Sequence, residues 1–448
     1  MATRSAVNNR HSKTLNEEII VSQISRRQAI ALLGALGFGA TAAACAGPGG
    51  STAPGGATGP AAPATGDITG KLSFAHWRGE DKVVFDELIK RFAALHDGVE
   101  VAQDISTSND YNAQALQKLR GGSIGDAFAT FRGSQFKNFT EAGIYTELKD
   151  SKAVSNYQEG LLSAGKSGES QLGLPYQVVF PMPMANVDLF DKAGAELAPK
   201  DWDSFLAMCE KLASSGVIPI SWPGGDVGNG GQLFNCMIAN NAPVDDMCAQ
   251  IEQGKLKVTD DWFIKMLGQY KDLVPYLQPN ATGTAVEPAQ NLFSQGKAAM
   301  LATGSYHIAA VRGLGAQFPI ELVFPNTSDG NAKYEGVYNA TFILGVNSAS
   351  KNQAAAAAWI DFLSEPENAA YYANETAQHV SVKDVDYTNP DLKRLSPWLD
   401  KNTALAARFQ FQNLDVRNAV EASATAVISG TSPEQAAEAA QKIVDERI

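Results

Sequence analysis

Several short apolar runs in this sequence are followed at once by aromatic or charged side chains that could bind a ligand. The run at 298–302 has the length of a buried strand, Gly304 and Ser305 interrupt it, and Tyr306 follows. In open α/β sheets, ligands bind beyond the C-terminal ends of the strands. An aromatic ring at that place can lie against the flat apolar face of a sugar, so Tyr306 is a candidate binding residue. Taken alone, the segment also fits an ordinary buried helix and strand.

The same arrangement recurs elsewhere in the chain. Apolar runs at 71–75, 127–131 and 217–220 each end in aromatic or polar residues, and a run at 342–346 has a polar residue at its approach. An aromatic platform beside polar groups suits neutral saccharides, whose rings present both C–H faces and hydroxyl rims. Trp222 fits this role but also fits a role as core filler. The candidates at these places are Trp77, Arg78, Glu80, Phe131, Arg132, Trp222, Asp226 and Asn339.

Signals for catalysis, metals and cofactors are weak. Residues 121–125 match the Gly-x-Ser-x-Gly pattern of hydrolase nucleophiles, but that pattern needs a strand before it and a helix after it, and here the predicted order is reversed. The glycine-rich loop at 224–231 lacks the Gly-Lys-Ser/Thr of a phosphate-binding loop. With five histidines, four cysteines and no Cys-x-x-Cys or His-Glu-x-x-His spacing, we expect no catalytic residue, metal or cofactor.

The elements that would position the candidate residues alternate between strand and helix. A strand at 71–75, a helix at 81–95, a strand at 99–105 and a helix at 110–119 predict a parallel sheet with right-handed crossovers. A chain of 448 residues is long for one core, so two lobes are expected. The formal net charge of −12 gives no indication of a basic surface for nucleic acid.

The first 69 residues read as an export and anchoring region. Arg26 and Arg27 precede an apolar run at 29–44, which indicates an export signal over 1–44, similar to the twin-arginine type, although the general export route stays open. The run ends in a lipobox-like segment at Cys45, the expected lipidation site, unless this cysteine follows the signal by chance. Residues 45–69 are rich in Gly, Ala, Pro and Thr and are expected to form a flexible tether. Pairing between Cys236 and Cys248 is left open.

Several weak motifs along residues 70–448 occur in an order that resembles one protein family. They are Gly296-Lys297-x-Ala-Met, the Gly-x-Pro-Tyr at 173–176, the Asn-x-x-Leu-Phe-x-x-x-Gly at 186–194, the Pro-x-x-Trp-x-x-Phe at 199–205 and the C-terminal segment at 428–436. This set resembles the family 1 extracellular solute-binding proteins of the maltose-binding-protein type, which are the capture subunits of ABC importers. Tyr306 stands where that family usually has Trp.

The resemblance implies an α/β, two-lobed periplasmic-binding-protein-like fold of type II, with each lobe a sheet flanked by helices and a hinge between them. It adds Tyr176, at the start of the first crossing between lobes, to the candidate site. It further implies a monomeric, non-enzymatic lipoprotein at the outer face of the bacterial cell membrane, which captures a sugar or oligosaccharide and delivers it to ABC permease subunits. The expected lobes are 70–180 with 326–378, and 181–325 with 379–448.

Two other functions remain open on the sequence alone. A secreted lipoprotein glycosidase would also present aromatic and acidic residues in a cleft, and its catalysis would need two carboxylates about 5–9 Å apart. A protein that binds peptides or polyamines could share the same fold. The identity of the sugar, its length and its linkage are not fixed by these patterns.

Overall fold

The computed structural model describes residues 59–122 and 124–448. The predicted export signal at 1–44, the lipidation site Cys45, the tether up to residue 58 and Ser123 of the Gly-x-Ser-x-Gly pattern lie outside these residues. In the part of the chain that is described, none of the helices is both long and apolar enough to span a bilayer.

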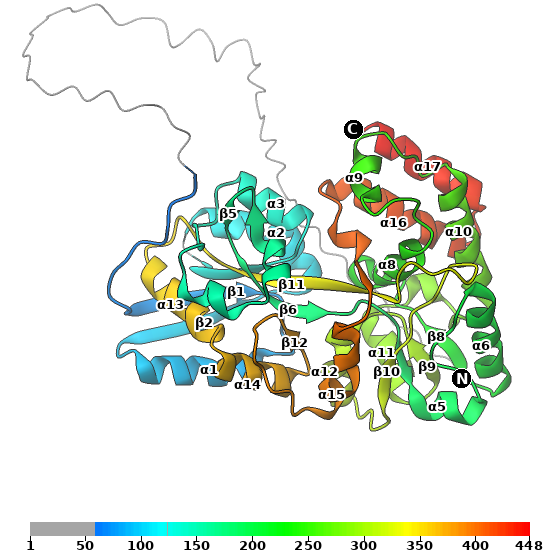
Figure 1. Cartoon of the computed structure of the whole chain (residues 1–448), viewed down its shortest axis with the longest axis horizontal. Helices are drawn as coiled ribbons and strands as arrows, with labels where there is room; N and C mark the ends of the chain where they lie inside the picture. The colour runs from blue at the N-terminus through cyan, green and yellow to red at the C-terminus, as the bar shows by residue number, and fades with distance from the viewer. Residues whose placement is uncertain (1–58, 123) are drawn as a thin grey trace, which may run out of the picture. The chain divides into compact units, whose positions relative to one another are not determined.

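The larger of the two main sheets has seven strands in the order β12-β6-β11-β3-β1-β2, with β13 paired to β11 (Figure 1). As predicted, β1 runs parallel to β2 and β3, but β11 is antiparallel to β3 and β6, so the predicted all-parallel sheet is mixed. The reason is that β6 leads the chain out toward the second sheet, whereas β11 brings it back. The strands are β1 (Gly70–His76), β2 (Val99–Ile105), β3 (Ala127–Thr130), β6 (Leu174–Val179), β11 (Gly336–Val346), β12 (His379–Val380) and β13 (Thr403–Leu405).

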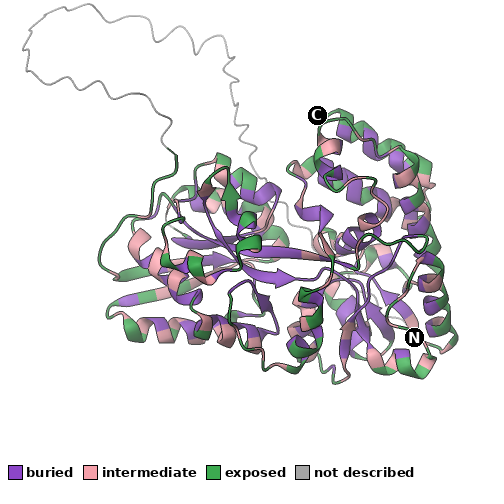
Figure 2. Ribbon diagram, viewed as in Figure 1, coloured by how far each residue is buried: buried purple, intermediate pink, exposed green. Residues whose placement is uncertain are grey.

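Helices cover both faces of this first sheet, and each face has its own apolar core. The helical spacing of Phe85, Leu88 and Phe92 places these side chains in one core, where they join the fully buried Trp359. Figure 2 shows the resulting pattern, with buried strands inside and exposed outer helix faces. The helices on one face are α1 (Lys82–Leu95), α13 (Gln353–Leu363) and α14 (Pro366–Thr376), and those on the other include α2 (Ser108–Arg120) and α3 (Ser134–Glu141).

The second main sheet has four strands in the order β10-β7-β9-β8. They are β7 (Met184–Asn186), β8 (Ile218–Ser221), β9 (Ala298–Leu301) and β10 (Ile320–Leu322). Asp201 caps α6 through a capping box, and Ser432 caps α17, with Pro433 in the first turn. Trp202 is buried in the adjoining core.

Most of the remaining helices belong to the second sheet and its helical layer. The helices of this part are α5 (Val187–Ala193), α6 (Trp202–Ser214), α7 (Val227–Gly230), α8 (Gln232–Ala239), α9 (Met247–Glu252), α10 (Asp261–Leu273), α11 (Val286–Ser294), α12 (Ile308–Gly313), α15 (Pro390–Leu395), α16 (Leu414–Ile428) and α17 (Pro433–Asp445). A short helix α4 (Glu159–Leu162) and a hairpin of β4 (Lys166–Ser167) and β5 (Ser170–Gln171) lie in sequence before β6.

The chain passes between the two sheets after β6, before β11 and after β12. Contacts place residues 326–329 beside second-sheet helices, because Asn326 donates to the carbonyl of Lys200 (2.7 Å) and Gln269 donates to that of Thr327 (3.0 Å). The predicted boundary had placed these residues in the first lobe. Conversely β12, predicted for the second lobe, pairs with β6 of the first sheet. The lobe boundaries as a whole stay a prediction.

The end of the predicted tether is attached to the first sheet's layer rather than free. The backbone N–H of Glu147 donates to the carbonyl of Ala61 (2.8 Å), and the N–H of Ala64 donates to Oε1 of Gln353 (2.7 Å). Ile68 then packs against the core of the first sheet. The prediction of a flexible segment up to residue 69 is therefore wrong for this part, because its backbone groups find partners that composition does not show.

The three cysteines in the described residues are buried and unpaired. The thiol of Cys236 donates to the carbonyl of Pro181 (3.4 Å), and that of Cys248 donates to the carbonyl of Ala407 (3.5 Å). The pairing of Cys236 with Cys248, left open by the sequence, does not occur in this structure.

Candidate ligand-binding cavity

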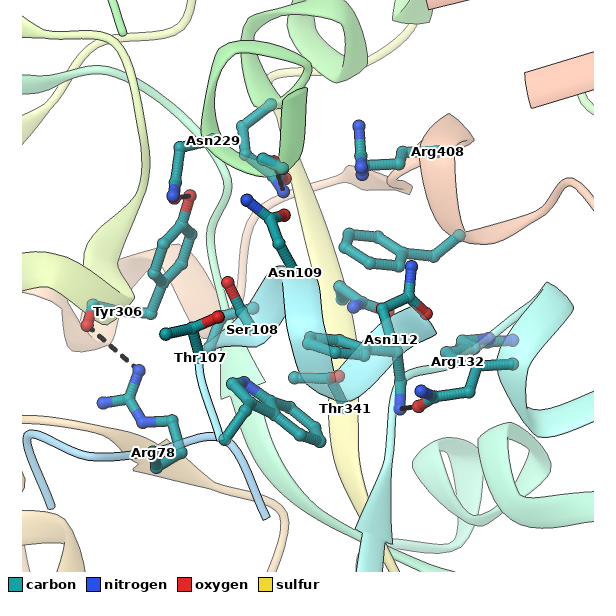
Figure 3. Close-up of a pocket in the computed structure, with 18 of the residues that line it drawn as sticks. Arg78, Thr107, Ser108, Asn109, Asn112, Arg132, Asn229, Tyr306, Thr341 and Arg408 are labelled. Carbon is teal, nitrogen blue, oxygen red and sulfur yellow. Dashed lines mark hydrogen bonds between the residues drawn. The ribbon is translucent and has the colours of Figure 1, made fainter. Parts of the chain in front are cut away.

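A cavity of about 760 Å³ lies between elements of the two sheets. On the first-sheet side it is bordered by the ends of β1, β2 and β3, the start of α2, and the middle of β6 and β11. On the other side it is bordered by α7, the segments Ser305–His307 and Ala407–Phe409, and α16. Its size falls in the range usual for small-molecule sites, and Figure 3 shows side chains from both sides pointing into it.

Stacked aromatic rings form an apolar platform at the ends of β1 and β3. The rings of Trp77 and Phe131 lie with their centroids 3.7 Å apart and their planes 25° from parallel. Phe342 supports Trp77 edge-on, at a centroid distance of 5.0 Å. Because β1 and β3 are adjacent parallel strands, their C-terminal residues come together at one edge. The sequence had named Trp77 and Phe131 as separate candidates, and the structure stacks their rings at this edge.

Tyr306 contributes a third ring from the second-sheet side. Its segment follows β9, and its hydroxyl donates to Oδ1 of Asn229 (3.4 Å; Figure 3). The neighbouring His307 also borders the cavity, and no partner for its Nδ1 is found in the described ranges. Burial, followed by the charge of Arg78, lowers the pKa of His307 to about 3, so its ring is neutral at physiological pH.

Arg78 is held in a buried network and is largely occupied by protein partners. Its Nε and Nη2 donate to both carboxylate oxygens of Asp81 (2.8 and 2.9 Å), and Nη1 lies 2.9 Å from Oε1 of Glu80. Nη1 also donates to the carbonyl of Tyr306 (3.3 Å), which joins the end of β1 to the second-sheet side. Although burial opposes the charge, the two carboxylates outweigh it and raise the pKa of Arg78 above its ordinary value.

Two polar side chains on β11 border the cavity without protein partners. Asn339 is fully buried, and within residues 59–122 and 124–448 neither its Oδ1 nor its Nδ2 has a hydrogen-bond partner. The hydroxyl of Thr341 likewise has no hydrogen-bond partner in these ranges. The two residues are two positions apart on the strand, so their side chains point to the same side of the sheet. Buried polar groups are nearly always paired in folded proteins, and leaving one unpaired is costly. Both side chains are therefore candidates for hydrogen bonds to a ligand, although their polar atoms are shielded from water in this structure.

Amides and a carboxylate lie on the rim of the cavity. Asp226 caps the short helix α7 by accepting from the N–H of Asn229 (3.0 Å), and it also accepts from Nδ2 of Asn109 (3.5 Å). Asn112 follows one helical turn after Asn109 and points toward the same space (Figure 3). Together these groups provide donors and acceptors of the kind that hydroxyl-rich ligands need.

Three further arginines border the cavity, and Figure 3 shows two of them, Arg132 and Arg408, across the view from Tyr306. Arg132 follows β3, Arg408 lies in the segment Ala407–Phe409, and Arg417 lies in α16. Arg408 forms an ion pair with the carboxylate of Glu421, a residue of α16.

The structure brings eight of the ten predicted site residues to this cavity. These are Trp77, Arg78, Glu80, Phe131, Arg132, Asp226, Tyr306 and Asn339. Their role in binding stays a prediction.

Tyr176 and Trp222 do not border the cavity, so their assignment to it is wrong. Tyr176 lies on the opposite side of β6 from Gln177, is fully buried, and donates from its hydroxyl to the carbonyl of Leu363 (3.0 Å). The indole of Trp222 turns into the core of the second sheet, and its N–H donates to the carbonyl of Gly230 (2.8 Å). Trp222 therefore has the core role that the sequence left as an alternative.

Residues that the sequence did not single out come mainly from distant segments. Arg408 and Arg417 lie in the C-terminal part of the chain, and Asn109 and Asn112 lie at the start of α2. The position of α2 after a predicted strand offered a signal for the two asparagines, because helix starts follow strand ends in α/β folds. For the two arginines the sequence offers no comparable signal.

Comparison with known proteins places this fold in a family. The family model for the bacterial extracellular solute-binding protein matches residues 79–370. An ABC transporter extracellular-binding protein of Pyrococcus horikoshii, named as uncharacterised, is 25% identical over 364 residues, which cover 77% of this chain and 78% of the relative.

Solved structures share the fold. A chitin oligosaccharide binding protein matches with a TM-score of 0.72 and 22% identity, covering 85% of this chain and 99% of that one. The bacterial solute receptor AcbH, described as having an exclusive preference for β-D-galactopyranose, matches with a TM-score of 0.73 and 19% identity, covering 84% and 98%. The predicted two-lobed α/β fold is confirmed by these matches.

The family match covers more than half of the chain and agrees with the resemblance predicted from the motifs. The proteins matched are binding proteins, which removes the glycosidase alternative. This chain belongs to the family of bacterial extracellular solute-binding proteins.

Proposed function

We propose that this protein is the extracytoplasmic substrate-binding component of an ABC importer, and that it captures a sugar or oligosaccharide and delivers it to the permease. The observation that carries the proposal is the pairing of an apolar platform, Trp77 stacked on Phe131, with the unpaired amide of Asn339 at the same cavity. A sugar ring would meet the platform with its C–H face and the amide with its hydroxyls. The sugars named for the structural neighbours support this class of ligand.

Capture would involve closure of the two sheets and their helices around the sugar. Two polar contacts join the sides of the cavity: Arg78 to the carbonyl of Tyr306 (3.3 Å) and Asn109 to Asp226 (3.5 Å). Opening the cavity by a hinge motion would break both contacts, and a bound sugar would add contacts to both sides. The ligand then shifts the equilibrium toward the closed arrangement. The size of this shift equals the difference between its binding free energies for the closed and the open arrangement.

Anchoring at the outer face of the membrane through a lipid on Cys45 completes the proposal. The lipobox-like sequence around Cys45 and the small-residue segment after it support this view. We expect the protein to act as a monomer. Mass spectrometry of the N-terminal peptide tests the anchor: a diacylglyceryl adduct on Cys45 is expected, and an unmodified cysteine in a processed N-terminus contradicts it.

A thermal-shift screen of the mature protein against sugars, polyols, amino acids, peptides and polyamines tests the ligand class. A ligand that binds only the folded state raises the melting temperature by mass action. We expect a selective shift with one class of sugar, and recovery of that sugar unaltered. A shift with peptides or polyamines and none with sugars would overturn the ligand class.

A further inference from the structure

We propose that the saccharide captured here carries an anionic group, a carboxylate, sulfate or phosphate, which Arg132, Arg408 and Arg417 hold at one end of the cavity. This inference rests on the proposed function and narrows its substrate class. The sequence had named only Arg132 of the three.

The charges at this end of the cavity do not balance. Three guanidinium groups border it, whereas Glu421, which pairs with Arg408, is the one carboxylate in the described residues that forms an ion pair with any of them. The local sum is therefore about +2. Burial raises the pKa of Glu421, whereas the charges of Arg408 and Arg417 oppose this rise.

Arg78 offers a contrast within the same cavity. Its guanidinium is matched by the carboxylates of Asp81 and Glu80. Asp226, the other carboxylate that borders the cavity, is turned to the N–H of Asn229 and to Asn109. Figure 3 shows Arg78 and Tyr306 on one side of the view, and Arg132 and Arg408 on the other. The excess positive charge is therefore carried by Arg132, Arg408 and Arg417 rather than by Arg78.

Two of the arginines have donors that no protein group uses. Within the described ranges, Arg132 has no hydrogen bond or ion pair, and Nε of the buried Arg417 has no partner. Burial lowers the pKa of Arg132, and burial together with the charge of Arg408 lowers that of Arg417 to about 10. Guanidinium groups stay protonated in proteins at neutral pH. Arg132 is half-buried without an ion-pair partner in these ranges, and the buried Arg417 shares the charge of Glu421 with Arg408, so one carboxylate faces three guanidinium groups. An anion supplied by the ligand would balance this excess positive charge.

The backbone is shaped to bring these arginines together. Gly133, which follows Arg132, has a φ of 85°, and a Cβ there would lie 2.8 Å from the carbonyl oxygen of Phe409. Glycine therefore allows the segment that carries Arg408 to approach the end of β3. The N–H of Arg408 is fixed by Oδ1 of Asn235 (2.9 Å). Planar guanidinium groups at such a point suit the paired oxygens of a carboxylate, sulfate or phosphate.

The test compares matched acidic and neutral sugars by calorimetric titration of the mature protein. The pairs are digalacturonate and galactobiose, glucuronate and glucose, N-acetylglucosamine 6-sulfate and N-acetylglucosamine, and glucose 6-phosphate and glucose. We expect the acidic member of at least one pair to bind about tenfold or more tightly than its neutral partner, and to weaken as salt rises. The pair that responds distinguishes carboxylate from sulfate or phosphate.

The variant Arg132→Gln provides a clean probe, because among the described residues this side chain has no hydrogen-bond or ion-pair partner that the substitution would leave unpaired. Its loss should weaken binding of the acidic sugar by about 10- to 100-fold, as expected for a hydrogen bond to a charged group, with about twofold or less effect on a neutral sugar. Lys137→Gln is the matched control: Lys137 is exposed on α3, outside the cavity, and should change neither affinity.

Two results would overturn the inference while the proposed function stands: neutral sugars that bind as tightly as acidic ones in every pair, or an equal effect of Arg132→Gln on both members. Binding of acetate or inorganic sulfate as tightly as the acidic sugars would also overturn it, because the saccharide would then add nothing. Absence of binding by any sugar, acidic or neutral, would refute both the inference and the proposed function.

Discussion

Replacing Asn339 by Leu should make the ligand-free protein more stable and at the same time weaken ligand binding. Asn339 is fully buried, and in the described residues neither polar atom of its side chain has a partner. Each buried unpaired group costs about 1–3 kcal/mol, and leucine has a similar shape without polar atoms. After allowance for imperfect packing, we expect a gain of about 1–3 kcal/mol in the free energy of unfolding.

The same substitution removes the hydrogen bonds that a sugar would receive from Asn339. We expect the affinity for the sugar to fall by about 2 kcal/mol, which is roughly thirtyfold. Urea unfolding of the ligand-free protein measures the first effect, and calorimetric titration measures the second. Opposite signs for stability and affinity are typical of a residue kept for function.

Asn347, the residue that follows β11, provides a matched control. It is equally buried, but its Nδ2 donates to the carbonyl of Leu119 (2.9 Å) and its Oδ1 accepts from the N–H of Ala349 (3.0 Å). Asn347→Leu should therefore lower the free energy of unfolding by about 1–3 kcal/mol and leave affinity unchanged. If Asn339→Leu behaves in the same way as Asn347→Leu, the reasoning about Asn339 is refuted.

Three further predictions follow from the geometry. Trp77→Ala should weaken sugar binding by about 1–3 kcal/mol. Trp222→Ala should instead lower the free energy of unfolding by about 3–5 kcal/mol, with little change in the affinity of the folded protein. Calorimetric titration measures the first effect and urea unfolding the second, and the reverse pattern would contradict the assignment of the site. Burial lowers the pKa of His76 to about 4 and that of His307 to about 3, so the unfolded state takes up protons that the folded state does not. The free energy of unfolding should therefore fall as pH drops below about 6.5, by roughly 2 kcal/mol per histidine between pH 7 and pH 5. A free energy of unfolding that stays constant over this interval would contradict the neutral state of the buried rings. The three buried thiols should react with a thiol reagent only after unfolding, and a reducing agent should leave the melting temperature unchanged; a fall in melting temperature on reduction would reveal a disulfide.

Much of the fold could be predicted because local pattern and register agree in this chain. The strand expected at 99–105 has those bounds in β2. Tyr306 could be placed because a short apolar run, a glycine and an aromatic residue follow one another within a few positions. These signals involve residues that are close together in the sequence, so they can be recognised without knowledge of the tertiary structure.

The faces of buried strands were harder to predict. Every residue of β6 is buried, so hydrophobic alternation does not show which side faces the cavity. Gln177 borders the cavity, while its neighbour Tyr176 points into the core, and a difference of one position reverses the role. Trp222 could not be assigned either, because its loop fits both roles until the partner of its indole, the carbonyl of Gly230, is known.

Long-range assembly accounts for the rest of what the sequence did not show. Arg408 and Arg417 reach the cavity because the C-terminal segment returns to it, and the close approach at Gly133 depends on carbonyls far away in sequence. The direction of β11 likewise depends on where the chain has been before it. No local pattern contains this information.

A crystal structure of the mature protein with the sugar selected by the thermal-shift screen would test the central claim most directly. The account predicts a sugar ring lying on the platform of Trp77 and Phe131, with hydroxyls hydrogen-bonded to the side chain of Asn339. A sugar bound elsewhere on the protein, with Asn339 still unpaired, would contradict it.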